Sequence, residues 1–270
     1  MAHSVRSRRS NDMRKIQRAL MGNYILEDLH DYRVDRHSFT IYVGADPHDE
    51  GDWEGNVAVE PGVTHHMANR LTMNLHILEN MNPKKPILII MATNGGDWNA
   101  GMQMYDAIGN CPNPITVLAM KHARSMSSLF PLVADRFLLT PSAYYLLHYG
   151  TFEVSGLSGE FANTMDEERR LTNDKMLRIY VARMKEQGKF KRTYEAEIRS
   201  MLEDRMSRKV DVFFSPQEAR EWGFIDGIYT GKEPLRIQTR NEERRKRMTE
   251  ATLAQVKIHP PKIVVTKKKS

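Results

Sequence analysis

PILIIMATNGGDWNAGMQMYDAI (86–108) is the stretch that decides the fold, because it joins a buried strand, a tight turn and a helix. Residues 86–92 form a short, continuous apolar run, which is typical of a strand covered on both faces. Residues 93–97 are a turn, and the apolar residues of 99–110 recur at helical spacing. A strand that leads through a turn into a helix predicts a sheet with a helix packed against it.

The same alternation continues on both sides of this stretch. Apolar runs predict further strands at 39–44, 115–120, 136–140 and 143–148, and helical periodicity predicts helices at 66–81 and 125–134. Strands that alternate with helices indicate an α/β fold with a mainly parallel sheet. The acidic, glycine-rich stretch 44–56 is interpreted as a surface loop.

The character of the sequence changes after the last of these strands. Residues 159–187 predict one long helix that is rich in Glu, Arg, Lys and Met and contains no proline. Its apolar positions form no strong stripe, so we expect it to project from the body and to meet another copy of the chain. SPQE (215–218) can start a short helix with a capping box, and a last strand is predicted at 224–229.

The composition is that of a soluble globular protein, since 40% of the residues are apolar and 27% are charged. The longest clean apolar run, 87–92, is far shorter than the ~20 residues of a membrane-spanning helix, so no membrane partner is expected. The N-terminal segment has no apolar signal-peptide core, although its Arg and Ser content keeps a short organellar transit peptide open. Cys111 is the only cysteine, which excludes an intramolecular disulfide and fits a reducing, cytoplasmic compartment.

The net charge of +6 is concentrated at the two ends of the chain. Residues 1–20 carry six Arg or Lys and one Asp, and residues 232–270 carry twelve Arg or Lys and four Glu, so 21–231 is net negative. We therefore predict a basic N-terminal tail (1–20), one folded domain (21–231) and a basic, mostly disordered C-terminal tail (232–270), with 240–255 as a candidate helix. Basic tails can bind nucleic acid or an acidic partner, but solvated tails are the simpler interpretation and nucleic acid is not expected.

Three features can carry chemistry at one edge of the predicted sheet. Ser125 lies at a strand–helix junction, where free backbone N–H groups favour negative charge. It is therefore a candidate nucleophile, with the Met126 N–H as a candidate oxyanion donor. Gly95 and Gly96 end the preceding buried strand and let the backbone approach a ligand closely. His148 ends a later strand and is a candidate general base.

Each of these features also has an ordinary explanation. A serine that opens a helix is most often its cap, a Gly-Gly turn is usually only a turn, and a histidine at a strand end is more often structural. Ser127, Ser128 and Ser142 are rival nucleophiles, and His122 is a rival base. Residue types and spacing alone therefore indicate an α/β protein with a candidate serine site.

Four pieces of sequence between residues 39 and 229 occur in a characteristic order. They are the strand, Gly-Gly loop and helix of 86–108, ARSM at 123–126, LLH at 146–148 and DVFFSPQEAREWGFIDGI at 211–228. With a long helix between the third and fourth pieces, this set resembles the proteolytic subunit of the Clp protease, a self-compartmentalised family of serine peptidases. The resemblance implies a crotonase-like fold of repeated β-β-α units, with a mainly parallel sheet and a projecting handle helix.

The resemblance also assigns roles to three side chains. It makes Ser125 the nucleophile, His148 the general base and Asp211 the acid that orients the base and stabilises its charged form. From the residues alone Asp211 would not stand out, because Asp204 and Asp226 look equally suitable.

By the same matching, the backbone N–H groups of Gly96 and Met126 form the oxyanion hole. The implied activity is that of a serine endopeptidase, which hydrolyses peptide bonds through an acyl-enzyme inside a stacked-ring homo-oligomer. Unfolded polypeptide is the implied substrate, and protein quality control the implied role. A separate AAA+ ATPase unfoldase is the implied partner, since the glycines of 96–101 lack the Lys-Ser/Thr of a phosphate loop. No cofactor is implied.

Several positions depart from the pattern of that family. Asn94 replaces the usual proline before Gly-Gly, Arg124 stands where small residues precede the nucleophile, and Tyr149-Gly150 replaces Gln-Pro after the histidine. Residues 44–64 resemble an insertion. These departures leave the three candidate side chains in place, but Arg124 can narrow the substrate pocket or attract acidic side chains.

Three other hypotheses stay open beside the peptidase. The chain can be a non-catalytic ring subunit, a viral head-maturation peptidase whose basic tail binds a scaffold or capsid, or an acyl-CoA enzyme of the crotonase type, which would not need the Ser–His–Asp set. A metal site is not expected, because no standard ligand spacing fits the cluster of His48, His65, His66, Asp46, Asp49 and Glu50.

Overall fold

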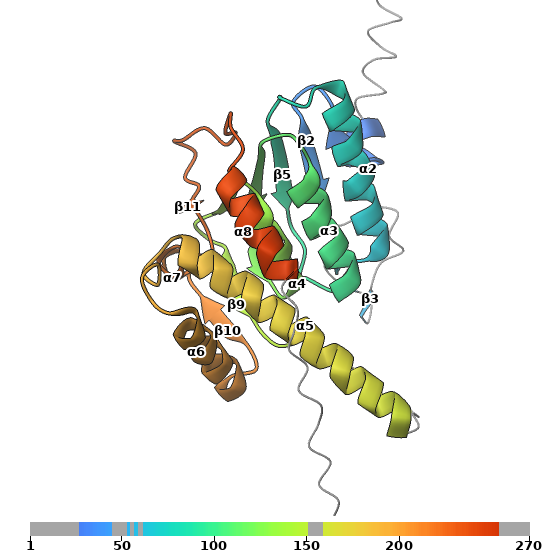
Figure 1. Ribbon diagram of the computed structural model, residues 1–270. Helices are drawn as coiled ribbons and strands as arrows, with labels where there is room; N and C mark the ends of the chain where they lie inside the picture. The colour runs from blue at the N-terminus through green and yellow to red at the C-terminus, as the bar shows by residue number, and fades with distance from the viewer. Residues whose placement is uncertain (1–26, 45–52, 55–56, 59–61, 151–158, 254–270) are drawn as a thin grey trace, which may run out of the picture.

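The computed structural model describes residues 27–44, 53–54, 57–58, 62–150 and 159–253. Among them, six strands form a central sheet in the order β1-β2-β5-β6-β8-β11 (Figure 1). Every neighbouring pair is parallel except β1 and β2. The strands are β1 Val34–Asp35, β2 Thr40–Val43, β5 Ile87–Met91, β6 Ile115–Ala119, β8 Arg136–Leu139 and β11 Gly227–Ile228. This arrangement confirms the predicted α/β class with a mainly parallel sheet.

Both faces of the central sheet are covered by other parts of the chain. On β5, Ile87, Ile89 and Met91 join the main core, whereas Leu88 belongs to a smaller cluster on the opposite face, because alternate residues of a strand point to opposite sides. Leu235, from the segment after β11, packs against that smaller cluster. Burial on both faces explains why the central strands are continuous apolar runs in the sequence.

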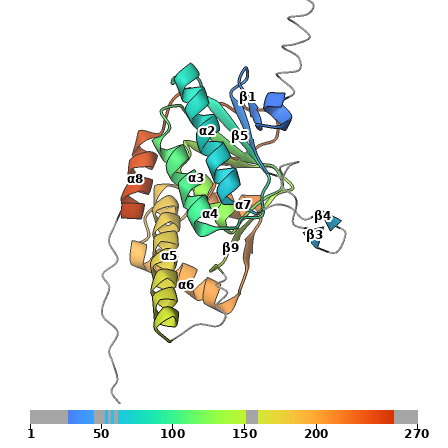
Figure 2. The same cartoon turned by 90° about the vertical axis from the view of Figure 1, so that its right-hand side faces the viewer.

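Two helices, α2 (His65–Met81) and α3 (Trp98–Asn110), pack against each other and cover the main-core face of the sheet (Figures 1 and 2). Thr64 caps α2 with its side chain. Asp97 caps α3 by accepting a hydrogen bond from the N–H of Ala100 at 2.7 Å. Because Asp97 directly follows the Gly-Gly loop, this cap fixes the point at which the loop ends and the helix begins.

A second sheet of three strands has the order β10-β9-β7. These are β7 His122–Arg124, β9 Tyr144–Leu147 and β10 Val212–Phe214, with β7 parallel and β10 antiparallel to β9. A separate antiparallel pair, β3 Trp53–Glu54 and β4 Val57–Ala58, lies in and just beyond the stretch interpreted as a surface loop. The short strand β7 was not predicted from the sequence.

The helix predicted at 125–134 is shorter than expected. It is divided into α4 (Met126–Leu129) and a 3-10 turn, η1 (Phe130–Val133). Pro131 accounts for the change, because proline has no N–H to donate to the preceding turn of an α-helix. The last strand, predicted at 224–229, is also shorter and consists of β11 alone.

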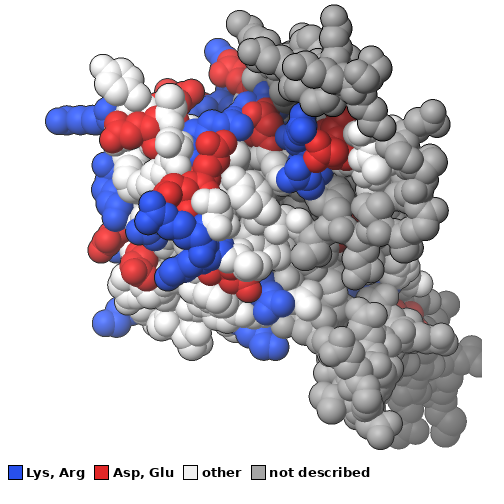
Figure 3. All heavy atoms as spheres, turned by 90° about the horizontal axis from the view of Figure 1, so that it is seen from below, with Lys and Arg blue, Asp and Glu red and all other residues white. Residues whose placement is uncertain are grey.

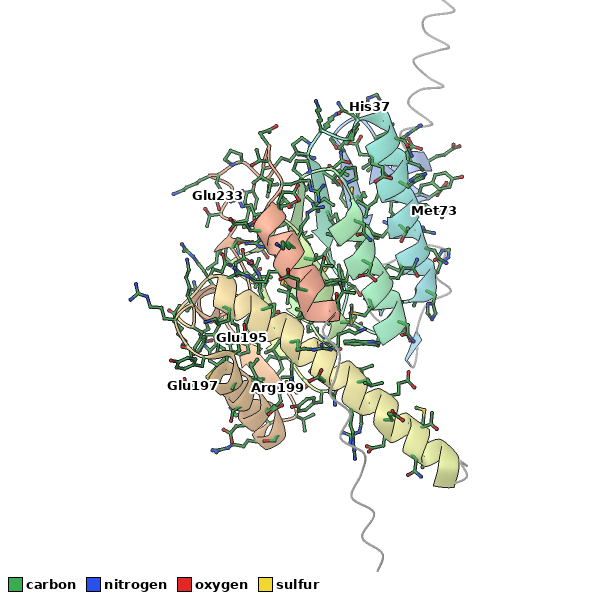
Figure 4. The ribbon with its side chains drawn as sticks, in the orientation of Figure 1. His37, Met73, Glu195, Glu197, Arg199 and Glu233 are labelled. Carbon is green, nitrogen blue, oxygen red and sulfur yellow. The ribbon has the colours of Figure 1, made fainter. Side chains whose placement is uncertain are left out.

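The long helix expected at 159–187 corresponds to α5 (Gly159–Glu186). Its C-terminal half is buried in the main core through residues such as Leu177 and Met184, whereas its N-terminal half extends beyond the rest of the described chain (Figure 1). The helix α6 (Glu195–Arg208), which was not predicted, packs against α5. There the labelled Arg199 pairs with Asp174 of α5 at 2.6 Å (Figure 4).

The short helix α7 (Pro216–Trp222) begins as the sequence predicts. The Ser215 side chain accepts from the N–H of Glu218, and the Glu218 carboxylate accepts from the N–H of Ser215 at 2.8 Å. These two bonds form the expected capping box. The pKa of the Glu218 carboxyl is lowered, because the N–H and the hydroxyl of Ser215 both donate to the carboxylate and favour its charged form.

The prediction of a mostly disordered tail from residue 232 is wrong for residues 232–253. The helix α8 (Glu242–Leu253) lies along α5, close to the candidate helix at 240–255 (Figure 1). Arg244 and Arg245 are each 3% exposed, so two of the charges counted as solvated belong to the interior. The expected tail at 1–20, and residues 254–270, lie outside the described residues.

Buried ion pairs hold α8 in place. The Arg245 guanidinium forms hydrogen bonds with the carboxylate of Asp135, and Arg244 bonds to Asp226 at 2.7 and 2.9 Å and to Glu186 at 2.8 Å. Asp226 also accepts from Arg183, whose side chain is fully buried. Each buried charge is therefore paired, which is the condition for keeping ions away from water.

The surface carries charges of both signs. On the face seen from below, Lys and Arg side chains lie interspersed with Asp and Glu (Figure 3). Within the part of the chain that the structure describes, no helix combines the length and the apolar character needed to cross a membrane.

Candidate active site

The three-stranded sheet brings the three candidate side chains together. Val212 of β10 pairs with Leu147 of β9, so the residue before Val212, Asp211, lies opposite His148. Arg124, the last residue of β7, pairs with Leu146 of the parallel strand β9. Ser125 therefore follows β7 at the same end of the sheet at which His148 follows β9. Residues far apart in the sequence thus meet because three short strands are in register.

Ser125 has an unusual backbone conformation, with φ 52° and ψ −130°. Residues other than glycine rarely adopt positive φ, and such strain costs about 1–3 kcal/mol and clusters at functional sites. Ser128 holds the position, because its N–H and its hydroxyl both donate to the Ser125 carbonyl, at 3.0 and 2.7 Å. The Ser125 side chain makes no capping bond to α4, so the ordinary explanation of a helix cap is wrong.

The rival serines have structural roles or lie elsewhere. The buried Ser127 hydroxyl donates to the carbonyl of Thr93 at 2.8 Å, and that of Ser128 is shared between the Ser125 carbonyl and the hydroxyl of Tyr180. Ser142 is exposed and does not line the cavity described below. Among the candidate serines, Ser125 alone faces that cavity within the described residues.

His148 is oriented by an acidic side chain. Its Nδ1 lies 3.3 Å from Oδ1 of Asp211, while its Nε2 is buried and makes no hydrogen bond within the described residues. The Ser125 hydroxyl is therefore not hydrogen-bonded to Nε2, and in serine hydrolases this bond often shortens only when substrate binds. The rival base His122 is buried against the Tyr144 ring, 5.3 Å between centroids, and does not line the cavity.

A cavity of about 480 Å³ opens in front of Ser125 and His148. The cavity is lined by the Gly-Gly loop and the start of α3, by Met126 and Leu129 of α4, and by a wall formed by one face of α5. Asp211 lies behind His148 and is not part of the lining. A volume of this size is in the range of ordinary ligand pockets.

Two backbone N–H groups can face the reacting centre. Val63 donates to the Gly95 carbonyl at 2.7 Å and accepts from the Asp97 N–H at 2.9 Å, so it pairs with Gly96 as in a parallel sheet. In that pairing the N–H of Gly96 points away from Val63, and Gly96 lines the cavity. Met126 is the first residue of α4, where an N–H has no acceptor within the helix.

Gly95 can be replaced by no other residue without moving the candidate nucleophile. Its φ is +89°, and a Cβ added there would lie 2.6 Å from the Ser125 Cβ and 2.9 Å from the Met126 nitrogen. We expect Gly95→Ala to lower the rate at which an active-site-directed reagent labels Ser125 by about 100-fold, since a displacement of ~1 Å in a catalytic group has that effect.

Gly231→Ala is the matched control for this prediction. Gly231 has a similar φ of +87°, but an added Cβ would meet nothing within 4 Å. Both variants carry the cost of an alanine at positive φ, about 1–2 kcal/mol of stability, and only Gly95→Ala crowds Ser125. Equal labelling rates in the two variants would contradict the prediction.

Sequence analysis missed the contribution of α5 to the cavity. Glu168, Thr172, Met176 and Tyr180 follow one another at intervals of four residues and line the same wall. The four-residue spacing is visible in the sequence and predicts that these residues share one helix face. It does not tell what that face contacts, so the cavity could not be predicted from it. Burial raises the pKa of the Tyr180 hydroxyl well above its ordinary value, so it stays protonated and donates to Ser128.

Arg124 does not enter the cavity, contrary to the expectation that it narrows the pocket. Its Nε donates to the carbonyl of Asn94 at 3.2 Å, and its Nη1 reaches the Tyr144 hydroxyl at 3.4 Å. Within the described residues, no group of three or more metal-ligating side chains is found. Of the suspected cluster, His48, Asp46, Asp49 and Glu50 lie outside the described residues.

Comparison with known proteins shows the family of the chain. Residues 52–232 match the family model of the Clp protease, which is more than half of the chain. The chain belongs to the Clp protease family. The helix α8 follows the matched region, so the family model does not account for it.

Two Clp protease subunits show how far the sequence of this chain has diverged within the family. The ATP-dependent Clp protease proteolytic subunit of Bdellovibrio bacteriovorus is 27% identical over 170 residues, 62% of this chain and 74% of that protein. The ATP-dependent Clp protease proteolytic subunit 1 of Chlamydia trachomatis serovar D is 29% identical over 171 residues, 62% of this chain and 81% of that protein. The resemblance inferred from four pieces of sequence is thereby confirmed at the level of the family.

Proposed function

We propose that this protein is a serine endopeptidase that cleaves peptide bonds through an acyl-enzyme on Ser125. The observation that carries the proposal is the position of His148, which is paired with Asp211 through Nδ1 and shares a cavity with Ser125. An imidazole held on one nitrogen by a carboxylate, with the other nitrogen free, is suited to take a proton from a nearby hydroxyl.

The proposed reaction gives Ser125, His148 and Asp211 each a defined role. Ser125 Oγ attacks the peptide carbonyl while His148 Nε2 takes its proton, and Asp211 stabilises the imidazolium. The Gly96 and Met126 N–H groups bind the oxyanion, and loss of one such donor typically costs ~3 kcal/mol of transition-state stabilisation. His148 then protonates the leaving amine, and a water molecule activated by the same imidazole releases the acyl group.

The proposal extends to the assembly in which this reaction takes place. The relatives are named proteolytic subunits of an ATP-dependent protease, and we propose the same division of labour here, with a separate AAA+ ATPase unfoldase that delivers unfolded polypeptide. The exposed N-terminal half of α5 is proposed as the handle that joins two rings of a homo-oligomer into a chamber. A cytoplasmic role in protein quality control goes with this proposal.

A fluorophosphonate probe tests the central step. The wild-type protein should be labelled on Ser125 and should hydrolyse short peptides without an ATPase, whereas Ser125→Ala should show neither reaction. Ser142→Ala, which changes an exposed serine outside the cavity, should react like the wild type. Persistent labelling of Ser125→Ala would remove Ser125 from the nucleophile role, and an assembled wild type without either reaction would identify a non-catalytic ring subunit.

A further inference from the structure

The cavity wall formed by α5 changes in polarity along its length. Tyr180 and Met176 are buried at the inner end, Thr172 is half-buried, and Glu168 is exposed at the outer end. At 1.5 Å per residue, Glu168 lies about 12 Å along the helix axis from Met176, which is about the span of three to four residues of an extended peptide. The inner end therefore suits an apolar side chain, and Glu168 faces a different residue of the same bound peptide.

The cavity has more acidic than basic side chains in its described lining. Its described lining contains two carboxylates, Glu168 and Asp97, and neither lysine nor arginine. The two arginines closest to Glu168 in sequence, Arg169 and Arg170, pair with Asp166 instead, at 2.6 and 2.7 Å. Arg124, which precedes Ser125, is bonded to the Asn94 carbonyl outside the cavity, as described above.

We propose that this cavity selects peptides with a lysine or arginine within a few residues of the scissile bond, and that Glu168 is the residue that recognises the cation. The inference rests on the proposed peptidase function and adds the substrate class to it. The methylene stem of the basic residue lies along the half-buried part of the α5 wall, while its charge meets Glu168. Acidic residues at the same place are disfavoured, because they face like charge in a partly desolvated cavity.

The test is a set of internally quenched peptides that are identical except for one residue. Lysine, glutamine or glutamate is placed in turn at each of the four positions on either side of an apolar residue. At the position that Glu168 contacts, kcat/KM should fall in the order Lys, Gln, Glu, with about a tenfold difference between the Lys and Glu peptides. The preference should weaken in high salt, because the contact is only partly buried.

Variants of α5 assign the preference to one residue. Glu168→Gln should reduce the Lys-to-Glu ratio to about twofold, and Glu168→Lys should invert it. Glu167→Gln is the matched control, because Glu167 is exposed on the same turn but does not line the cavity, and it should keep the wild-type ratio. Since each ratio is measured within one preparation, differences in folding or assembly between variants cancel.

The outcomes separate this inference from the proposed function. A wild type that labels on Ser125 and cleaves the peptides without regard to charge would overturn the inference and leave the peptidase intact. A Lys preference that survives in Glu168→Gln would also overturn it, because another group would then recognise the cation. A wild type that neither labels nor cleaves would overturn both.

Discussion

The Asp211→Asn variant is expected to hydrolyse peptides about 10⁴-fold more slowly than the wild type, with little change in folding. In the native protein the Asp211 carboxylate faces Nδ1 of His148 at 3.3 Å and so favours the tautomer that leaves Nε2 unprotonated. An amide in its place can donate to Nδ1 and so stabilise the opposite tautomer, which carries its proton on Nε2. In that tautomer Nε2 cannot accept the proton of Ser125. The loss should appear in kcat, since Asp211 does not line the cavity that binds the peptide.

Asp204→Asn provides the control for this experiment. Asp204 lies in α6, the helix that precedes β10. Its ion pair with Arg208 is on the exposed surface and contributes little to stability. We expect wild-type kinetics from this variant, measured with the same peptide and the same fluorophosphonate probe. An Asp211→Asn variant that retains most of its activity would mean that Asp211 does not orient the base.

The choice among these acids shows where sequence reasoning reaches its limit. Asp204, Asp211 and Asp226 stand close together in the sequence, and nothing in their local patterns separates them. The structure separates them by partners, since Asp204 pairs with Arg208, Asp226 with buried arginines and Asp211 with His148. The register of β9 and β10 decides which aspartate faces His148, and register is set by contacts between residues that are distant in the sequence.

The elements that sequence analysis found and missed differ in how they are stabilised. The central strands and α2 and α3 carry their signal in the sequence, because each buries an apolar run or stripe of its own. The helix α6 is largely polar, and α8 is held by Arg244 and Arg245, whose charges count as solvated until their partners are known. Burial by ion pairing is a tertiary property, so composition predicted a mostly disordered tail around the candidate helix at 240–255, and the packing of that helix could not be foreseen.

The buried ion pairs of α8 lead to a second large effect, on stability. Asp226 is 16% exposed and accepts hydrogen bonds from Arg183, Arg244 and the backbone N–H of Phe137. Asp226→Asn removes the carboxylate charge that faces two buried guanidinium groups, those of Arg183 and Arg244. The two buried guanidinium groups then have only one acidic partner in common, Glu186, so we expect a loss of about 3–5 kcal/mol in the free energy of unfolding.

Urea unfolding at a fixed protein concentration measures this loss, with Asp204→Asn as the control for an exposed ion pair. The double variant Asp226→Asn/Arg244→Met should lose less than the sum of the two single variants, because one of the two buried guanidinium charges is then absent. A loss below about 1 kcal/mol in Asp226→Asn would show that the network does not hold α8 in place.

The effect of Asp226 should depend on pH in a defined direction. Burial alone would raise the pKa of its carboxyl, but the charges of Arg183 and Arg244 and the hydrogen bonds outweigh it, so the pKa lies well below its ordinary value. A carboxyl with a lowered pKa in the folded state stabilises the protein fully above its unfolded value of about 3.9, and this contribution is lost as the pH falls further. The difference in unfolding free energy between wild type and Asp226→Asn should therefore be constant from about pH 5 to 8 and shrink below about pH 4. A difference that grows on acidification would mean that Asp226 is protonated in the native protein.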